Sequence, residues 1–123
     1  MKAQTQEWLR RAEEDLGAAE VLMRESFLSA VMFHCQQAVE KILKALWTQT
    51  ENSTPPRTHD LVYLGEHLNI PLSEGQFDFL RRLGEQYVPT RYPLESPGFP
   101  EETTVLYFEQ TKEMFSWLQQ RLS

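Results

Sequence analysis

The residues with the most chemical potential lie in one segment of this sequence, Phe33–Ala45 (FHCQQAVEKILKA). At 100° per residue, a helix would place a set of polar and small residues in one sector: His34, Gln37, Ala38, Lys41, Lys44 and Ala45. Apolar and small residues lie beside and between the polar positions, so this face differs from an ordinary solvated one. Such a polar stripe could line a pocket, contact a partner helix or bind an anion.

Each residue of the stripe also has a purely structural interpretation. His34 could be a partly buried histidine bonded to a neighbouring helix, and Gln37 could be a buried amide whose hydrogen bonds are satisfied. We expect Glu40 and Lys44 to form a surface ion pair four residues apart, worth roughly 0.3–0.5 kcal/mol. Lys41 and Lys44 fit better as contacts for an anion, because they share the stripe with His34.

A second group of candidates, Arg57, Thr58, His59 and Asp60, begins a helix after two prolines. The first turn of a helix offers free N–H groups and a positive dipole end, which suits a phosphate. The alternative is simple capping by Thr58 or Asp60, with His59 packed over the turn.

A third group lies in the rigid turn Pro89–Pro93, where Arg91 and Tyr92 are adjacent. Arginine can form a forked contact with phosphate or carboxylate, and tyrosine can stack or donate a hydrogen bond. Alternatively, Tyr92 pins the loop against the rest of the protein and Arg91 bonds to the end of a helix.

Other chemistries have little support in the sequence. His34, His59 and His67 lack the spacing of metal ligands, and there is no Gly-rich phosphate loop or nucleophile elbow. Cys35 lies among apolar residues and is expected to be an inert core thiol. We therefore expect no metal and no cofactor, and the sequence identifies no catalytic residue.

The elements that must position these residues are helices, because apolar residues recur at alternating threes and fours along the chain. The pattern predicts helices over about Gln4–Glu25, Phe27–Gln49 and Glu74–Tyr87. A short helix, capped by Thr58 or Asp60, should run to Leu68, and the last helix should begin near Glu101 or Thr104 and reach Arg121. We expect the second helix to bury one face, which begins with its first residue. The residues of this face are Phe27, Val31, Cys35, Ala38, Ile42, Ala45, Leu46 and Gln49. The prediction is an all-α, up-and-down four-helix bundle with an additional short helix.

Turns and caps separate the helices. Ser26 can end the first helix and cap the second, and the first two helices must then pack antiparallel. Ser73 and Gln76 have the spacing of a capping box. The stretch Val88–Pro100 is rich in proline and reads as an ordered loop. Residues 1–123 are expected to form a single domain, a size that suits one core.

Composition limits the function. The net charge is −6 and the pI about 5.0, which argues against nucleic-acid binding through a broad basic surface. A local basic groove remains open, formed by Lys41, Lys44, Arg57, Arg81, Arg82 and Arg91. The single cysteine rules out an internal disulfide and favours a reducing compartment. The polar N-terminus and the lack of a long apolar run indicate a cytoplasmic protein with no membrane contact.

Three separated motifs together resemble those of bacterial and archaeal HEPN domains. They are Phe33–Ala45, Pro56–Leu61 (PRTHDL) and Tyr87–Pro93 (YVPTRYP), in the order and spacing of that family. The opening and closing helices also fit, so the resemblance covers nearly the whole chain.

The resemblance implies a helical bundle that usually forms homodimers. It also implies a role in nucleotide binding, and frequent pairing with a minimal nucleotidyltransferase, in some cases as toxin and antitoxin. Many HEPN proteins are metal-independent ribonucleases that use an arginine followed after four to six residues by a histidine. This chain lacks that spacing: the next histidine after Arg24 is His34, and Arg57 is followed by His59 and then His67.

Two classes of function follow, with a third as an alternative. The first is a non-catalytic module that binds a nucleotide or an RNA phosphate and acts as a homodimer with a minimal nucleotidyltransferase. The second is a metal-independent ribonuclease, and the third is a purely structural dimer. We favour the first, because the acidic net charge and the missing arginine–histidine spacing both argue against a general ribonuclease. Its expected ligand-binding residues are His34, Gln37, Lys41, Lys44, Arg57, His59, Asp60, Arg91 and Tyr92.

Overall fold

The computed structural model describes residues 1–86 and 99–123, and this part of the chain contains five helices and no strand. They are α1 (Ala3–Arg24), α2 (Leu28–Glu51), α3 (Leu61–His67), α4 (Glu74–Glu85) and α6 (Glu101–Gln119). The predicted all-α bundle of four main helices and one short helix is confirmed. No helix among the described residues is both long and apolar enough to cross a membrane.

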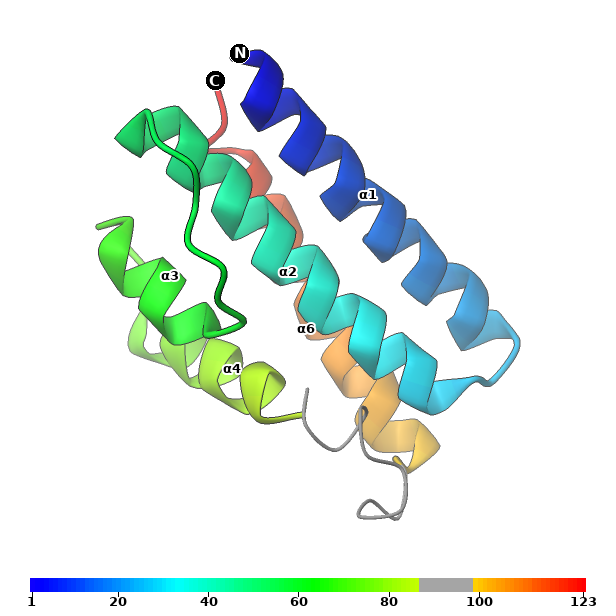
Figure 1. Cartoon of the computed structure of the whole chain (residues 1–123). Helices are drawn as coiled ribbons and strands as arrows, with labels where there is room; N and C mark the ends of the chain where they lie inside the picture. The colour runs from blue at the N-terminus through cyan, green and yellow to red at the C-terminus, as the bar shows by residue number, and fades with distance from the viewer. Residues whose placement is uncertain (87–98) are drawn as a thin grey trace.

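Helix α2 is the centre of the bundle (Figure 1). It contacts α1, α3, α4 and α6, and α1 lies antiparallel beside it over most of its length. The short helix α3 and helix α4 lie on the side of α2 away from α1, and both chain ends lie near the C-terminal end of α2. Side chains on every side of α2 are therefore buried, which explains why polar residues on this helix need partners from other helices.

The core forms where the apolar faces of the helices meet. Most of the set predicted for α2 is buried, as is the predicted face of α6 from Tyr107 to Leu118. Phe27 is an exception: its side chain is 59% exposed, because it is the N-cap residue of α2 and lies outside the helical repeat. Gln49 is only partly buried, and its amide binds the carbonyl of Arg121 and the backbone N–H of Ser123.

The predicted caps of α3 and α4 are present, whereas the predicted cap of α2 is not. Ser73 and Gln76 form the expected capping box of α4, and the Asp60 side chain caps α3 by accepting from the backbone N–H of Tyr63 at 3.0 Å. The prediction that Ser26 caps α2 is wrong. Ser26 has a φ of 61°, in the left-handed region, where it turns the chain between α1 and α2, and the cap position belongs to Phe27.

Candidate functional site

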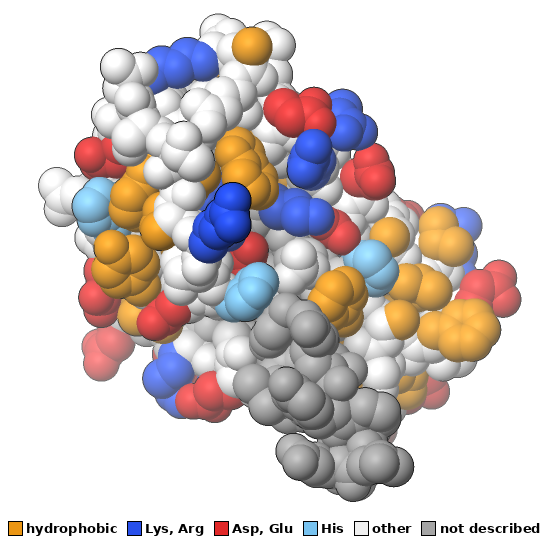
Figure 2. All heavy atoms as spheres, viewed as in Figure 1, with side chains coloured by type: hydrophobic (Ala, Val, Ile, Leu, Met, Phe, Trp, Pro, Cys, Tyr) orange, Lys and Arg blue, Asp and Glu red, His pale blue; other side chains and the backbone are white. Residues whose placement is uncertain are grey.

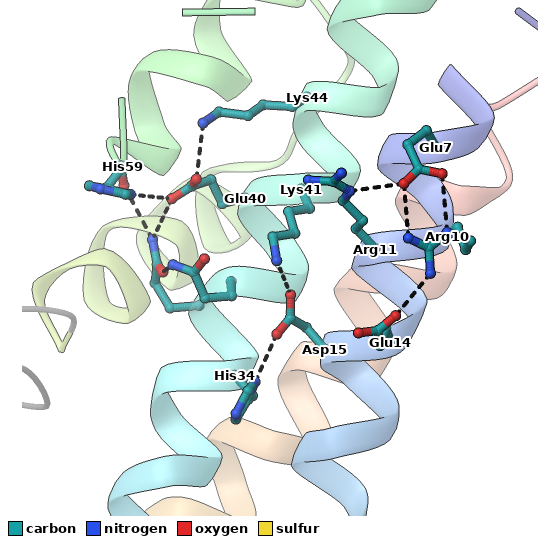
Figure 3. Close-up of polar contacts among 12 residues, drawn as sticks. Glu7, Arg10, Arg11, Glu14, Asp15, His34, Glu40, Lys41, Lys44 and His59 are labelled. Carbon is teal, nitrogen blue, oxygen red and sulfur yellow. Dashed lines mark hydrogen bonds and ion pairs between the residues drawn. The ribbon is translucent and has the colours of Figure 1, made fainter. Parts of the chain in front are cut away.

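The first part of the site is built around Asp15, a carboxylate on α1 that faces α2. Asp15 is only 8% exposed, yet it accepts two hydrogen bonds from α2 (Figure 3). His34 Nδ1 lies 2.7 Å from Asp15 Oδ1, and Lys41 Nζ lies 2.5 Å from Oδ2. Each oxygen of this carboxylate therefore orients one residue of the predicted stripe.

The second part is built around Glu40, which lies on α2 itself. Glu40 is 4% exposed and receives Lys44 Nζ at 3.0 Å, from one turn further along the helix. Its other oxygen receives His59 Nδ1 at 2.7 Å and Gln36 Nε2 at 3.2 Å. A buried carboxylate is tolerated only when it is paired and hydrogen-bonded, and Glu40 meets both conditions.

The burial of Glu40 corrects our expectation of a surface ion pair. The pair with Lys44 exists, but both side chains are less than a tenth exposed. The segment that precedes α3 lies over this part of α2 and brings His59 onto the carboxylate. The spacing of apolar residues within α2 could not predict that Glu40 is buried, because the residues that cover it belong to a separate segment of the chain.

A glutamine relay adjoins the Glu40 cluster. Gln37 Nε2 donates to Gln36 Oε1 at 2.7 Å, and Gln36 Nε2 also lies 3.4 Å from the backbone carbonyl of His59. Gln37, which we predicted as a site residue, is therefore already bonded. Its neighbour Gln36 is fully buried and was not predicted.

The two clusters contribute different groups to the surface. Lys44 is buried and its ammonium lies 5.5 Å from the centre of the Trp8 ring. The side chains of Lys41 and His34 are 25% and 28% exposed, and that of His59 is 57% exposed. The donors of the two clusters that solvent can reach are therefore the two histidines and Lys41, whereas Lys44 is buried.

The charges of the two lysines are compensated within the clusters. Asp15 pairs with Lys41 and Glu40 pairs with Lys44, so an excess of positive charge on this face would have to come from neighbouring arginines. Arg57 is exposed, two residues before His59. Figure 2 shows basic and histidine side chains gathered on this face over α1, α2 and the segment before α3, with acidic side chains between them.

The arginines expected to form a wider basic groove are placed differently from one another. Arg81 lines a surface hollow of about 270 Å³ together with His59, Asp60 and Glu85. Arg82 instead lies over the rings of Phe79 and Tyr107. Hydrogen bonds from Arg81 and Arg82 hold the pKa of the Asp78 carboxyl below its usual range, so both guanidinium groups are already paired.

The remaining candidates divide between bonded residues and residues outside the described part of the chain. Asp60 acts as the cap of α3, which is the alternative we gave for it. Arg91 and Tyr92 lie outside the described residues, as does most of the predicted loop Val88–Pro100. Cys35 is buried, which raises the pKa of its thiol to about 11 and keeps it protonated.

Asp15 is a residue of the candidate site that the sequence interpretation missed. It lies on a stripe of α1 with Trp8, Ala12 and Ala19, at spacings of four, three and four residues. A carboxylate at such an inward position needs a cationic or N–H partner. This spacing was the available signal, and the stripe of α2 offered the partner.

Comparison with known proteins gives the family. No protein with a curated description matches the sequence. The fold is similar to that in the crystal structure of TT1696 from Thermus thermophilus, with a TM-score of 0.85 and 21% identity over 98% of this chain and 100% of that one. It is also similar to ST0689, an archaeal HEPN homologue, with a TM-score of 0.75 and 22% identity over 100% of both chains. At these identities the two structures support the fold, whereas the sequence model of the HEPN domain matches residues 5–121 directly. The chain belongs to the HEPN domain family.

Proposed function

We propose that this chain is a non-catalytic HEPN module that binds the phosphate of a nucleotide or of RNA. The observation that supports the proposal is the pair of buried carboxylates, Asp15 and Glu40, each of which holds one histidine and one lysine. Fixed donors lose little conformational entropy when they meet an anion. The partly exposed groups that would make the contact are His34, Lys41 and His59, with Arg57 nearby.

A direct test is the binding of ribose 5-phosphate, measured by isothermal titration calorimetry. Lys41→Gln should weaken binding about tenfold, because one charge-assisted hydrogen bond is lost. The matched control is Lys112→Gln, which neutralises an exposed lysine of α6 whose partner is Glu109. Equal affinities of the two variants would contradict the proposed role of the stripe.

The same proposal includes the assembly of the protein. We infer that it acts as a homodimer and pairs with a minimal nucleotidyltransferase, on the basis of its family. Sedimentation velocity tests the first part, and co-purification from the native cells tests the second. A monomer at micromolar concentration, or purification with no nucleotidyltransferase, would contradict the corresponding part.

A metal-independent ribonuclease is the second candidate, favoured by one observation. His34 and His59 both present Nδ1 to a buried carboxylate, an arrangement that orients an imidazole for proton transfer. Lys41 would then stabilise the charge that develops on the phosphorus oxygens. Against it stands the absence of the arginine–histidine spacing that the family's ribonucleases use.

Cleavage of a labelled RNA in EDTA separates the two candidates. The non-catalytic module predicts no cleavage above the buffer control. The ribonuclease predicts cleavage that is lost in both His34→Ala and His59→Ala. Cleavage that survives in both variants would show contamination or a different site.

A further inference from the structure

An aromatic stack lies beside the polar stripe, where α2 meets α3. The rings of Trp47 and His67 are stacked, with centroids 3.9 Å apart and an interplanar angle of 16°. Tyr63 lies 6.4 Å from Trp47 at 28° and 6.2 Å from His67 at 33°. These three rings form a layered cluster, which we call the aromatic stack.

The aromatic stack continues the two rows of residues that include Lys44 and His59 of the proposed phosphate site. On α2, Trp47 follows Lys44 by three residues, and on the other side Tyr63 and His67 follow His59 at spacings of four. Contacts join the two rows at three successive levels. Glu40 binds His59, the ring of Trp47 stacks with that of Tyr63, and Glu51 lies 3.5 Å from His67. Along the axis of α2, the backbone of Trp47 therefore lies about 5 Å beyond that of Lys44.

The three rings of the stack differ in their exposure to solvent. Trp47 is buried and its indole N–H donates to Ser53 Oγ at 3.3 Å, so the innermost ring is fixed. Tyr63 is 47% exposed, and His67 is exposed as well. Figure 2 shows a histidine and hydrophobic side chains side by side over α3, with a basic side chain next to them. A rigid inner ring with exposed outer rings forms a platform on which a further flat group can stack.

We propose that the aromatic stack is a nucleobase-binding subsite, contiguous with the phosphate-binding stripe. The inference rests on the proposed function, which supplies the phosphate end of the ligand. Bases stack on aromatic side chains through a face that all bases share, so the subsite needs no base-specific hydrogen bond. The ligand class is then a nucleoside phosphate or a single-stranded nucleotide, with its base against Tyr63 and His67 and its phosphate toward His59.

Three probes divide the ligand into its parts: adenosine 5′-monophosphate, ribose 5-phosphate without the base, and adenosine without the phosphate. Each is titrated by calorimetry into the unmodified protein and into Tyr63→Ala, Tyr63→Phe and Phe27→Ala. Phe27 is the matched control, because it is an exposed aromatic residue in the turn between α1 and α2. We expect Tyr63→Ala to weaken adenosine 5′-monophosphate binding about tenfold and to leave ribose 5-phosphate binding unchanged. Tyr63→Phe and Phe27→Ala should bind all three probes as the unmodified protein does.

The outcomes separate this inference from the proposed function. Equal affinity for adenosine 5′-monophosphate and ribose 5-phosphate would overturn the base subsite and leave the phosphate site standing. Adenosine binding that depends on Tyr63, without any binding of ribose 5-phosphate, would support the subsite and overturn the phosphate site. A loss of affinity in Tyr63→Ala that also affects ribose 5-phosphate, or that Tyr63→Phe does not restore, would overturn a stacking role for this ring. Failure of all three probes to bind would overturn both.

Discussion

Asp15 and Glu40 have the same role at the scale of single residues. Each is a nearly buried carboxylate that accepts from one lysine and one histidine, and each joins α2 to another part of the chain. A charge in this position is costly if its partners are removed, and the partners are costly if the charge is removed. The stripe on α2 is therefore a structural feature as well as a candidate binding site, and mutations in it must be controlled for stability.

The stability contribution of Asp15 can be measured by urea denaturation. Asp15→Ala should lower the free energy of unfolding by about 2 kcal/mol, because His34 and Lys41 lose their acceptor. Glu13→Ala, an exposed carboxylate two residues earlier on α1, should stay within about 0.5 kcal/mol of the unmodified protein. Similar losses in the two variants would mean that Asp15 contributes no more than a surface charge.

The thiol of Cys35 provides a prediction about pH. Burial raises its pKa to about 11, so at pH 8 the folded protein should hold on the order of one thiolate in a thousand. Ellman's reagent should therefore label Cys35 very slowly until the protein is unfolded in urea, and labelling of the folded protein should speed up as the pH rises from 8 to 10. Rapid labelling at pH 8 without denaturant would contradict the burial of this thiol.

At the scale of the helices, Gly65 lies where α3 packs closely against α4 and the segment that leads into it. A Cβ at this position would lie 2.9 Å from Leu72 Cδ1 and 3.2 Å from Leu80 Cδ1. Gly17 on α1 has no such neighbour within 4 Å. Because alanine favours a helix over glycine by about 1 kcal/mol, Gly17→Ala should raise the melting temperature. Gly65→Ala should be at least about 1 kcal/mol less stable than Gly17→Ala, because the added methyl displaces both leucines. Thermal unfolding of the two variants would test this order, and equal stability would show that Leu72 and Leu80 move freely.

The helices themselves were predictable, because a helix that buries one face has apolar residues spaced three and four positions apart in the sequence. The caps at Asp60 and Ser73 were predictable too, since they depend on residues three apart. The carboxylate clusters were not, because Asp15 and His34 are 19 positions apart, as are Glu40 and His59. Which helix faces which is a property of the packed bundle, and only the odd placement of Asp15 among apolar residues pointed to it.

The charge of the whole molecule limits the kind of nucleic acid that the proposed site would bind. The net charge of −6 repels a polyanion, and the lysines of the stripe are already paired with carboxylates. Within the described part of the chain, few uncompensated cationic groups, such as Arg57, are then available to phosphates. The molecule should prefer a mononucleotide or a short single strand to a long duplex.

The dependence of RNA binding on salt tests this limit. With about two phosphate contacts on a single strand, raising the salt from about 50 to about 200 mM should weaken binding by no more than roughly tenfold. Fluorescence anisotropy of a labelled single-stranded RNA of about 20 nucleotides measures the slope, and Arg57→Ala should reduce the number of released ions by about one. A slope that requires about six or more contacts would mean that a basic surface forms when copies of the chain assemble. In that case the charge of one chain would no longer predict what the protein binds.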